Sequence, residues 1–359
     1  MRPTFATVRL GDIVSNYQLA MKLAPASRSI AVIKANAYGH GMVEVAQRLQ
    51  SVAPVFAVAL LEEAIMLREA GINQPILVMQ GISHATDVVL AAENNFWLLL
   101  HRQQQLDWLL SANLSNPVTA WVKVDTGMHR LGFSPGQLDR VFASMSSSSN
   151  VQPNPVLCTH LACADDQADP MTNTQLGLIC SCSKKYKLDM SIANSAGILF
   201  WRNSHASWNR PGYMLYGACP AGTFDSGAHG LRPAMTMSSE IMAIRNISPG
   251  EGVGYGHVWV AKRPSKIGTI AIGYGDGYPR HAPNGTPVLV NGKRVSLTGR
   301  VSMDAISVDL TDLETVEVGD QVELWGQNLG VNEVASFAGT IGYELLAGLT
   351  GRVPVHYDA

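Results

Sequence analysis

The sequence predicts an α/β protein, with an N-terminal (β/α)8 barrel of the TIM type followed by a mainly β domain. Two observations carry this prediction. Short apolar runs alternate with longer amphipathic segments from residue 11 to about residue 217, and β-prone runs separated by turn signals follow after residue 220. Strands that alternate with helices form a parallel sheet, and eight of them in this length favour a closed barrel over an open sheet.

The predicted barrel strands are eight apolar runs, at residues 30–34, 55–60, 75–80, 96–101, 118–125, 155–161, 190–195 and 207–212. Between them lie segments such as GMVEVAQRLQ (41–50) and LEEAIMLREAG (61–71). Their apolar residues recur at spacings of three and four, which is typical of amphipathic helices.

The Pro/Gly/Ser-rich stretch PAGTFDSGAHG (220–230) has no periodic apolar face and predicts a domain boundary. Beyond it, VSLTG (295–299), AISVDL (305–310) and QVELWG (321–326) are β-prone runs, separated by turn signals such as PNGTP and NGK. We therefore expect a barrel domain over residues 1–230 and a mainly β domain over residues 231–359.

Composition narrows the function. The chain has 359 residues, 47% hydrophobic and 15% charged, and no apolar run approaches the roughly 20 residues that span a bilayer. Its 26 Lys and Arg are scattered and the net charge is −2, so the basic stripe of a nucleic-acid binder is missing and a small-molecule partner is expected. The N-terminus lacks the pattern of a secretory signal, and the five cysteines lack the spacing of a zinc site, so we expect reduced thiols, no metal and a cytoplasmic protein.

Polar side chains follow the predicted barrel strands where each strand ends. Catalytic groups of parallel barrels collect at these carboxyl ends, so we expect the side chains to converge on one mouth. They are Lys34, Lys123, Asp125, Arg130, His160, Asn194, Ser195 and Arg210, with Gly212 close behind.

Lys34 gives the sharpest signal because it ends a buried apolar run. A desolvated lysine loses affinity for its proton, and a neutral amine is the nucleophile that condenses with an aldehyde. By itself, a lysine at a strand end is more often a side chain that reaches out to solvent.

Seven motifs resolve this ambiguity: KANAYGHG (34–41), VDTGMHRLGF (124–133), ANSAG (193–197), NRPGYMLYG (209–217), VGYG (253–256), IGYGDGYPR (272–280) and GRVSMD (299–304). In this order they resemble the alanine racemase family, pyridoxal-phosphate enzymes with an N-terminal barrel and a C-terminal β domain. The resemblance covers about residues 5 to 357. It implies an isomerase that interconverts L- and D-alanine, either to supply D-alanine for peptidoglycan or to serve alanine catabolism.

The resemblance also implies how the cofactor is held. Lys34 would bind pyridoxal 5′-phosphate covalently. Its phosphate would be met by Tyr38, Ser195, Tyr343 and the backbone near Gly212 and Tyr213, which agrees with the phosphate sites that barrels form after their last two strands. Asn194 would also belong to the cofactor site.

Arg210 would face the pyridine nitrogen, and His160 would orient Arg210. A guanidinium donates hydrogen bonds but does not surrender its proton, so the ring nitrogen would stay largely unprotonated. This weakens the electron sink and favours return of the proton to Cα over transamination.

Racemisation needs a base on each face of Cα. By resemblance these are Lys34 and Tyr255, and Tyr255 would come from the partner subunit of a homodimer with shared active sites. Arg130 and the backbone of Met303 would bind the substrate carboxylate, and Tyr274 and Asp304 would narrow the substrate entrance. Lys123 matches a position that is often carbamylated in the family.

Two residues depart from the usual family pattern. Tyr213 stands where many relatives have an aliphatic residue, and Ser302 replaces a cysteine. Both changes bear on the choice among small substrates.

Alternative functions have less support. A racemase of broader specificity or a decarboxylase of the same architecture is one, but such decarboxylases pair the cofactor ring with glutamate rather than arginine. A non-catalytic cofactor carrier would need neither Tyr255 nor a second domain. GYGDGY does not indicate a nucleotide site, because no helical pattern follows its glycines.

Overall fold

The computed structural model describes residues 2–221 and 226–358, which form two compact units. One unit comprises 16–37 and 42–215, and the other comprises 1–15, 38–41 and 216–359. The boundary predicted at 220–230 lies partly outside the described residues. The division into domains 1–230 and 231–359 stays a prediction.

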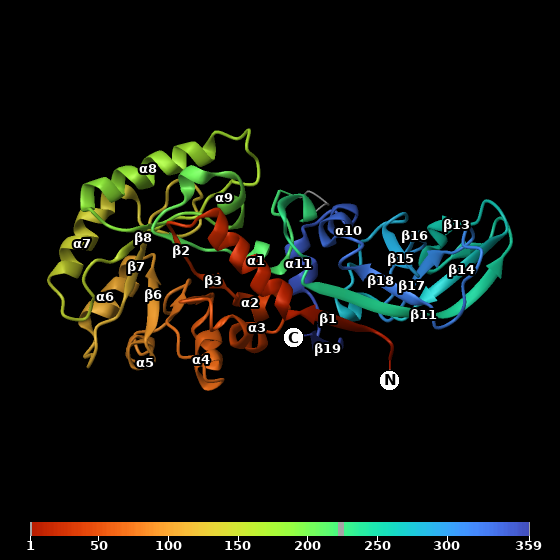
Figure 1. Ribbon diagram of the computed structural model, residues 1–359, viewed down its shortest axis with the longest axis horizontal. Helices are drawn as coiled ribbons and strands as arrows, with labels where there is room; N and C mark the ends of the chain where they lie inside the picture. The colour runs from red at the N-terminus through yellow and green to blue at the C-terminus, as the bar shows by residue number, and fades with distance from the viewer. Residues whose placement is uncertain (1, 222–225, 359) are drawn as a thin grey trace. The chain divides into compact units, whose positions relative to one another are not determined.

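The first unit is the expected closed parallel barrel (Figure 1). The strands are β2 (Arg28–Ser29), β3 (Ala31–Val32), β4 (Phe56–Val58), β5 (Ile76–Val78), β6 (Phe96–Leu100), β7 (Ala120–Lys123), β8 (Val156–Cys158), β9 (Met190–Ser191) and β10 (Trp208–Asn209). The first strand of the barrel is interrupted at Ile30 and forms two short pieces, β2 and β3. The piece β2 pairs with the last strand, β10, and the piece β3 pairs with the next strand, β4, which closes the sheet. Each of β3 to β10 lies within a predicted run, whereas β2 lies just ahead of the first run, which was predicted to begin at residue 30.

Helices cover the outer side of these strands, as Figure 1 shows for α4 to α8. In α3, the residues Met42, Val45, Ala46 and Leu49 are buried, which is the spacing of a helix with one apolar face. The helices are α1 (Leu10–Leu23), α2 (Lys34–Tyr38), α3 (Met42–Leu49), α4 (Leu61–Glu69), α5 (Asp87–Glu93), α6 (Gln103–Ser111), α7 (Leu138–Ser146), α8 (Met171–Tyr186) and α9 (Ser195–Phe200), with short 3₁₀ turns at η1 (Pro135–Gln137), η2 (Arg202–Ser204) and η3 (Tyr213–Tyr216).

Three tryptophans fill the barrel interior. Trp97 on β6, Trp121 on β7 and Trp208 on β10 have ring centroids 5.7 to 6.1 Å apart. Because β10 is not a neighbour of β6 or β7 in the sheet, these rings meet across the inside of the barrel. The interior is thus a packed core, and ligands are left to the strand ends.

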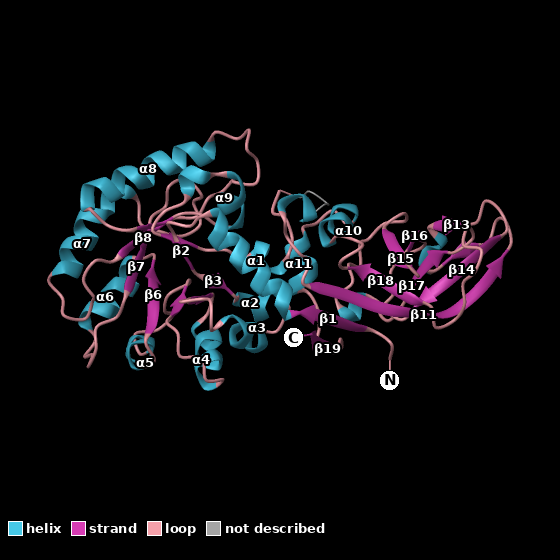
Figure 2. Ribbon diagram, viewed as in Figure 1, coloured by secondary structure: helices cyan, strands magenta, loops and turns pink. Residues whose placement is uncertain are grey.

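The second unit is mainly β, as expected (Figure 2). Its central strands form a closed antiparallel ring in the order β14, β17, β16, β15, β18 and β11, because β11 pairs with both β18 and β14. The strands are β1 (Phe5–Arg9), β11 (Met235–Ile247), β12 (Gly252–Val253), β13 (Trp259–Val260), β14 (Ser265–Ile270), β15 (Pro287–Val290), β16 (Lys293–Leu297), β17 (Ile306–Asp309), β18 (Gln321–Trp325) and β19 (Val355–Asp358).

Strand β1 pairs antiparallel with β11 and parallel with β19, so the start of the chain belongs to this β sheet. The sequence analysis did not predict this strand. The remaining elements of the unit are α10 (Val331–Phe337), α11 (Gly342–Ala347) and the 3₁₀ turns η4 (Ser226–His229), η5 (Tyr255–His257) and η6 (Tyr274–Asp276). Within the described ranges of the chain, no helix combines the length and apolar character needed to cross a membrane.

Candidate active site

Lys34 leaves the barrel at the carboxyl end of β3, as the sequence predicts. The preceding residue, Ile33, is fully buried and donates its N–H to the carbonyl of Ala57 at 2.9 Å. Burial lowers the pKa of the Lys34 amine, the positive charge of Arg130 lowers it further, and the carboxylate of Glu63 partly offsets both. The environment therefore favours the neutral, nucleophilic amine.

The residues after Lys34 form a left-handed turn. Ala35, Asn36, Ala37 and Tyr38 all have φ of 52°. This conformation costs non-glycine residues roughly 1–2 kcal/mol each, because Cβ approaches the following carbonyl oxygen. The hydrogen bonds that hold the turn include one from the N–H of Ala37 to Ile33 O at 2.9 Å and one from the N–H of Met42 to Asn36 Oδ1 at 2.9 Å.

Arg210 is fixed inside the barrel mouth, where it is 5% exposed. Its Nη1 donates to Ser191 Oγ at 2.5 Å, and its Nη2 donates to the carbonyls of Thr159 at 2.6 Å and Ile192 at 3.3 Å. Nη2 also lies 3.5 Å from Nδ1 of His160. The structure thus brings Arg210 and His160 together, and adds Ser191 and Thr159 as partners that the sequence analysis missed.

Lys123 ends β7 with its side chain inside the barrel, and the residue is 8% exposed. Burial lowers the pKa of this amine, and the charges of Arg210 and Arg130 lower it further. Within residues 2–221 and 226–358, its Nζ has no hydrogen bond or ion pair. The nearby carboxylate of Asp125 instead accepts from the N–H of Gly127 and from the N–H and ring of His129, each at 3.0 Å.

Ser195 and Asn194 lie where β9 passes into α9. Asn194 Oδ1 caps α9 by accepting from the N–H of Gly197 at 2.9 Å. Ser195 Oγ accepts from the N–H groups of Gly212 and Met214, each at 3.1 Å. The loops after the last two strands therefore direct a hydroxyl and two backbone amides to one point, and Tyr213 is buried between those amides.

The other predicted cofactor tyrosines lie together in the β unit. The ring centroids of Tyr38 and Tyr343 are 6.1 Å apart, and Tyr216 lies 4.8 Å from Tyr38. Burial raises the pKa of Tyr38, so its phenol stays protonated and can act as a hydrogen-bond donor. The sequence analysis missed Tyr216, although it lies in the motif NRPGYMLYG.

Tyr255 lies in η5, between the paired strands β12 and β13, and is 67% exposed. The guanidinium of Arg300 lies near Gly256 in the same turn. Cζ of Arg300 is 3.7 Å from the position that a Cβ atom on Gly256 would take. Tyr255 is thus an exposed phenol in a turn that a guanidinium approaches.

Tyr274, Met303 and Asp304 lie on two adjoining turns of the β unit. The N–H of Tyr274 donates to Ser302 O at 3.0 Å, and the N–H of Gly275 donates to Met303 O at 2.9 Å. Met303 is 52% exposed.

A fully buried carboxylate, Asp276, anchors these turns. Arg2 binds it through two hydrogen bonds of 2.5 and 2.7 Å, and Oδ2 accepts from the N–H of Gly273 at 2.9 Å. Arg352 lies 3.6 Å from Asp276 and 2.5 Å from the carboxylate of Asp304.

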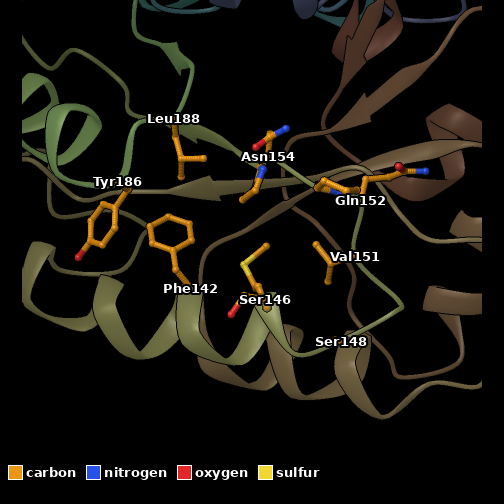
Figure 3. A pocket seen from close by; sticks show the side chains of 11 residues that line it. Phe142, Ser146, Ser148, Val151, Gln152, Asn154, Tyr186 and Leu188 are labelled. Carbon is orange, nitrogen blue, oxygen red and sulfur yellow. The ribbon is translucent and has the colours of Figure 1, made fainter.

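A cavity of about 410 Å³ lies at the opposite ends of the strands (Figure 3). It is lined by Phe142 and Ser146 of α7, by Val151 and Asn154 ahead of β8, and by Tyr186 at the end of α8. None of the predicted site residues lines it. The strand ends that carry Lys34 and Arg210 remain the candidate active site.

The fold and the site define a class of proteins: a barrel whose first strand ends in a lysine of lowered pKa, with the buried cations Lys123 and Arg210 at its mouth, joined to a β unit. Two protein-family profiles match the chain. The one for the alanine racemase N-terminal domain matches residues 8–220, and the one for the alanine racemase C-terminal domain matches residues 234–357. The chain belongs to the alanine racemase family.

Individual relatives span the full chain. The alanine racemase of Stutzerimonas stutzeri is 46% identical over 99% of both chains. The crystal structure of a biosynthetic alanine racemase from Pseudomonas aeruginosa covers 100% of both chains at 45% identity, with a TM-score of 0.96. An alanine racemase structure from Bartonella henselae, with covalently bound pyridoxal phosphate, covers 100% of both chains at 30% identity and a TM-score of 0.88.

Proposed function

We propose that this protein interconverts L- and D-alanine with pyridoxal 5′-phosphate held on Lys34. Membership of the alanine racemase family supports the substrate. The single observation that carries the cofactor assignment is the placement of Lys34 at a strand end, where burial and the positive charge of Arg130 lower the pKa of its amine. When bound, pyridoxal 5′-phosphate supplies an electron-withdrawing ring that makes the Cα proton of an amino acid acidic.

The donor set fits this cofactor. Lys34 provides the amine that an aldehyde requires, and the cations Lys123, Arg130 and Arg210 suit an anionic molecule. The hydroxyl of Ser195 and the amides near Gly212 and Tyr213 are donors for phosphate oxygens. We assign Asn194 to holding this loop, and Tyr38 and Tyr343 to further phosphate contacts.

Arg210 is suited to the ring nitrogen. Its hydrogen bonds to Ser191 and Thr159 fix the guanidinium, and such a group donates without giving up its proton. Burial and the charge of Arg210 hold the pKa of His160 well below its usual value, so His160 is neutral and can accept a hydrogen bond from Arg210. An arginine rather than a glutamate at the place of the ring nitrogen argues against a decarboxylase.

The two protons move at opposite faces of Cα. Lys34 removes or returns one, and Tyr255 of a second protomer handles the other. The exposure of Tyr255 in a single chain supports its contribution to a partner, and therefore a homodimer with shared active sites. Arg130 and the backbone of Met303 bind the substrate carboxylate, while Tyr274 and Asp304 restrict access to small amino acids.

We assign carbamylation to the side-chain amine of Lys123. A neutral amine adds to the carbon of CO₂ and releases a proton, which changes a cation into an anion that can pair with Arg130. The burial of Lys123 without a hydrogen-bonding partner among residues 2–221 and 226–358 supports this assignment.

We assign the protein to the cytoplasm, where it supplies D-alanine for peptidoglycan or takes part in alanine catabolism. Circular dichroism of L-alanine, incubated with protein and pyridoxal 5′-phosphate, tests the activity. The signal should decay to that of the racemate, and Lys34→Ala should lose both the decay and the visible absorbance of bound cofactor. An unchanged signal with the unaltered protein, or full activity in Lys34→Ala, contradicts the proposal.

A further inference from the structure

Glu63 lies in the first turn of α4, and its carboxylate has two sets of partners. Oε2 accepts from the N–H groups of Ala59 at 2.8 Å and Leu60 at 3.1 Å, which caps the helix. Oε1 accepts from the N–H of Ala35 at 2.6 Å. One carboxylate therefore joins the start of α4 to the residue that directly follows Lys34.

The contact with Ala35 goes beyond helix capping. Asp87, the first residue of α5, makes a similar pair of contacts, because its Oδ2 accepts from the N–H groups of Ser83 at 3.0 Å and His84 at 2.8 Å. These are the residues four and three places before it, as Ala59 and Leu60 are for Glu63. Asp87 is a cap alone, whereas Glu63 also binds the first residue of a strained left-handed turn.

That turn determines where the amine of Lys34 points. Ala35 follows Lys34 directly, and its φ of 52° sets the course of the chain away from β3. A hydrogen bond to a charged acceptor is stronger than one to a neutral acceptor, so Glu63 is a firm restraint on this backbone.

Charge adds a second effect. Glu63 is an acidic side chain that acts on Lys34 and favours its protonated form, whereas Arg130 disfavours that form. His160, the other titratable group that interacts with Lys34 at the barrel mouth, is held neutral by burial and by its cationic neighbours.

We propose that Glu63 is a positioning residue for Lys34, which fixes the left-handed turn and sets the direction and charge of the amine. The proposal deepens the proposed function and rests on it. Glu63 acts through Ala35 and Lys34 and does not itself touch the substrate.

Glu63→Gln is the direct test, because a glutamine has one carbonyl oxygen and cannot accept on both sides. Glu63→Asp keeps the charge but shortens the reach. Two control variants accompany these tests. Asp87→Asn removes the charge from a carboxylate that accepts from the N–H groups three and four places before it in the same barrel, and Glu62→Gln removes the neighbouring, exposed charge. Far-ultraviolet circular dichroism and urea unfolding establish that each variant folds.

The main measurement is the rate at which pyridoxal 5′-phosphate attaches to Lys34 in the full chain after cofactor removal. Absorbance gives the rate across a range of pH, and borohydride reduction with peptide mass analysis establishes the attachment site. Racemisation kcat and KM for alanine are measured on the reloaded variants.

In Glu63→Gln, the rate at its alkaline plateau should fall about tenfold because the amine is misdirected. The acid limb of the profile should move to lower pH because a negative charge near Lys34 is gone. Glu63→Asp should lower the plateau rate but move the acid limb less. Both controls should have the same plateau rate and the same acid limb as the unaltered protein. In racemisation, kcat should fall more than KM changes.

If Glu63→Gln folds and its attachment rate has the same alkaline plateau and the same acid limb as that of Asp87→Asn, the positioning role is wrong. The proposed function would then still stand. If the unaltered chain neither attaches the cofactor at Lys34 nor racemises alanine, the proposed function fails, and this inference fails with it.

Discussion

Nη2 of Arg210 lies 3.5 Å from Nδ1 of His160, so a permanent cation and an imidazole share one buried space at the barrel mouth. Burial is the main reason that the pKa of His160 lies well below its usual 6.5, and the charge of Arg210 is the next. A proton on His160 would place two cations side by side. The folded protein therefore excludes that proton.

This exclusion predicts a pH dependence of stability. Below pH 6.5 the unfolded chain protonates His160 while the folded chain does not, so the unfolded state binds more protons and the free energy of unfolding falls as pH falls. His160→Gln should lose less stability than the unaltered protein between about pH 7 and about pH 5. Urea unfolding at both pH values measures this, with exposed His84→Gln as control. Equal losses in His160→Gln and the unaltered protein contradict the account.

Lys123 predicts a stability gain on substitution. A buried cation without a partner is costly, so in bicarbonate-free buffer Lys123→Met should raise the free energy of unfolding by about 1 kcal/mol while activity falls. Bicarbonate should stabilise the unaltered protein and leave Lys123→Met unchanged, because only the former can form a carbamate. If bicarbonate affects the two alike, the carbamate assignment is wrong.

Tyr255 predicts an asymmetric defect. Because its side chain is exposed, Tyr255→Phe should keep the melting temperature, yet it should slow deuterium exchange at Cα of L-alanine far more than at Cα of D-alanine. Proton NMR in deuterated water measures both rates. Tyr357→Phe, at another exposed tyrosine of the β unit, is the control, and equal small losses for the two enantiomers in Tyr255→Phe would count against a two-base mechanism.

The ion pair between Arg2 and Asp276 predicts a large loss of stability. Arg2→Met leaves a fully buried carboxylate without its two-point partner, and about 3 kcal/mol of unfolding free energy should be lost. The exposed pair Arg263 and Asp312 supplies the control, because Arg263→Met should change stability little. Urea unfolding compares them. KM for alanine should also rise in Arg2→Met, since the turns of Tyr274 and Met303 lose their anchor.

Much of the fold was predictable because it depends on local patterns. Continuous apolar runs such as VFAVAL become strands buried on both faces, and β4 lies within that run. The rule that barrel sites form at strand ends then placed Lys34, Lys123 and Arg210 correctly at the mouth. Even the two-residue strands β9 and β10 follow from their place in the alternation.

Other features depend on contacts that no local pattern reveals. Strand β1 forms by pairing with β11 and β19, more than 200 residues away along the chain. Alanine favours the right-handed helix, so nothing in KANAYGHG predicts a left-handed turn. Glu63 has the sequence context of a solvated residue on an amphipathic helix, and only the fold brings it to Ala35.

The left-handed turn has a consequence for chemical synthesis. Ala35 and Ala37 occupy a region of backbone space that their mirror-image forms prefer, because inverting the Cα centre removes the clash of Cβ with the carbonyl oxygen. A semisynthetic chain with D-residues at these two positions should fold without strain there, and would be more stable than the all-L chain. Inverted handedness, which disrupts a backbone of negative φ, should therefore be tolerated at these two positions beside Lys34.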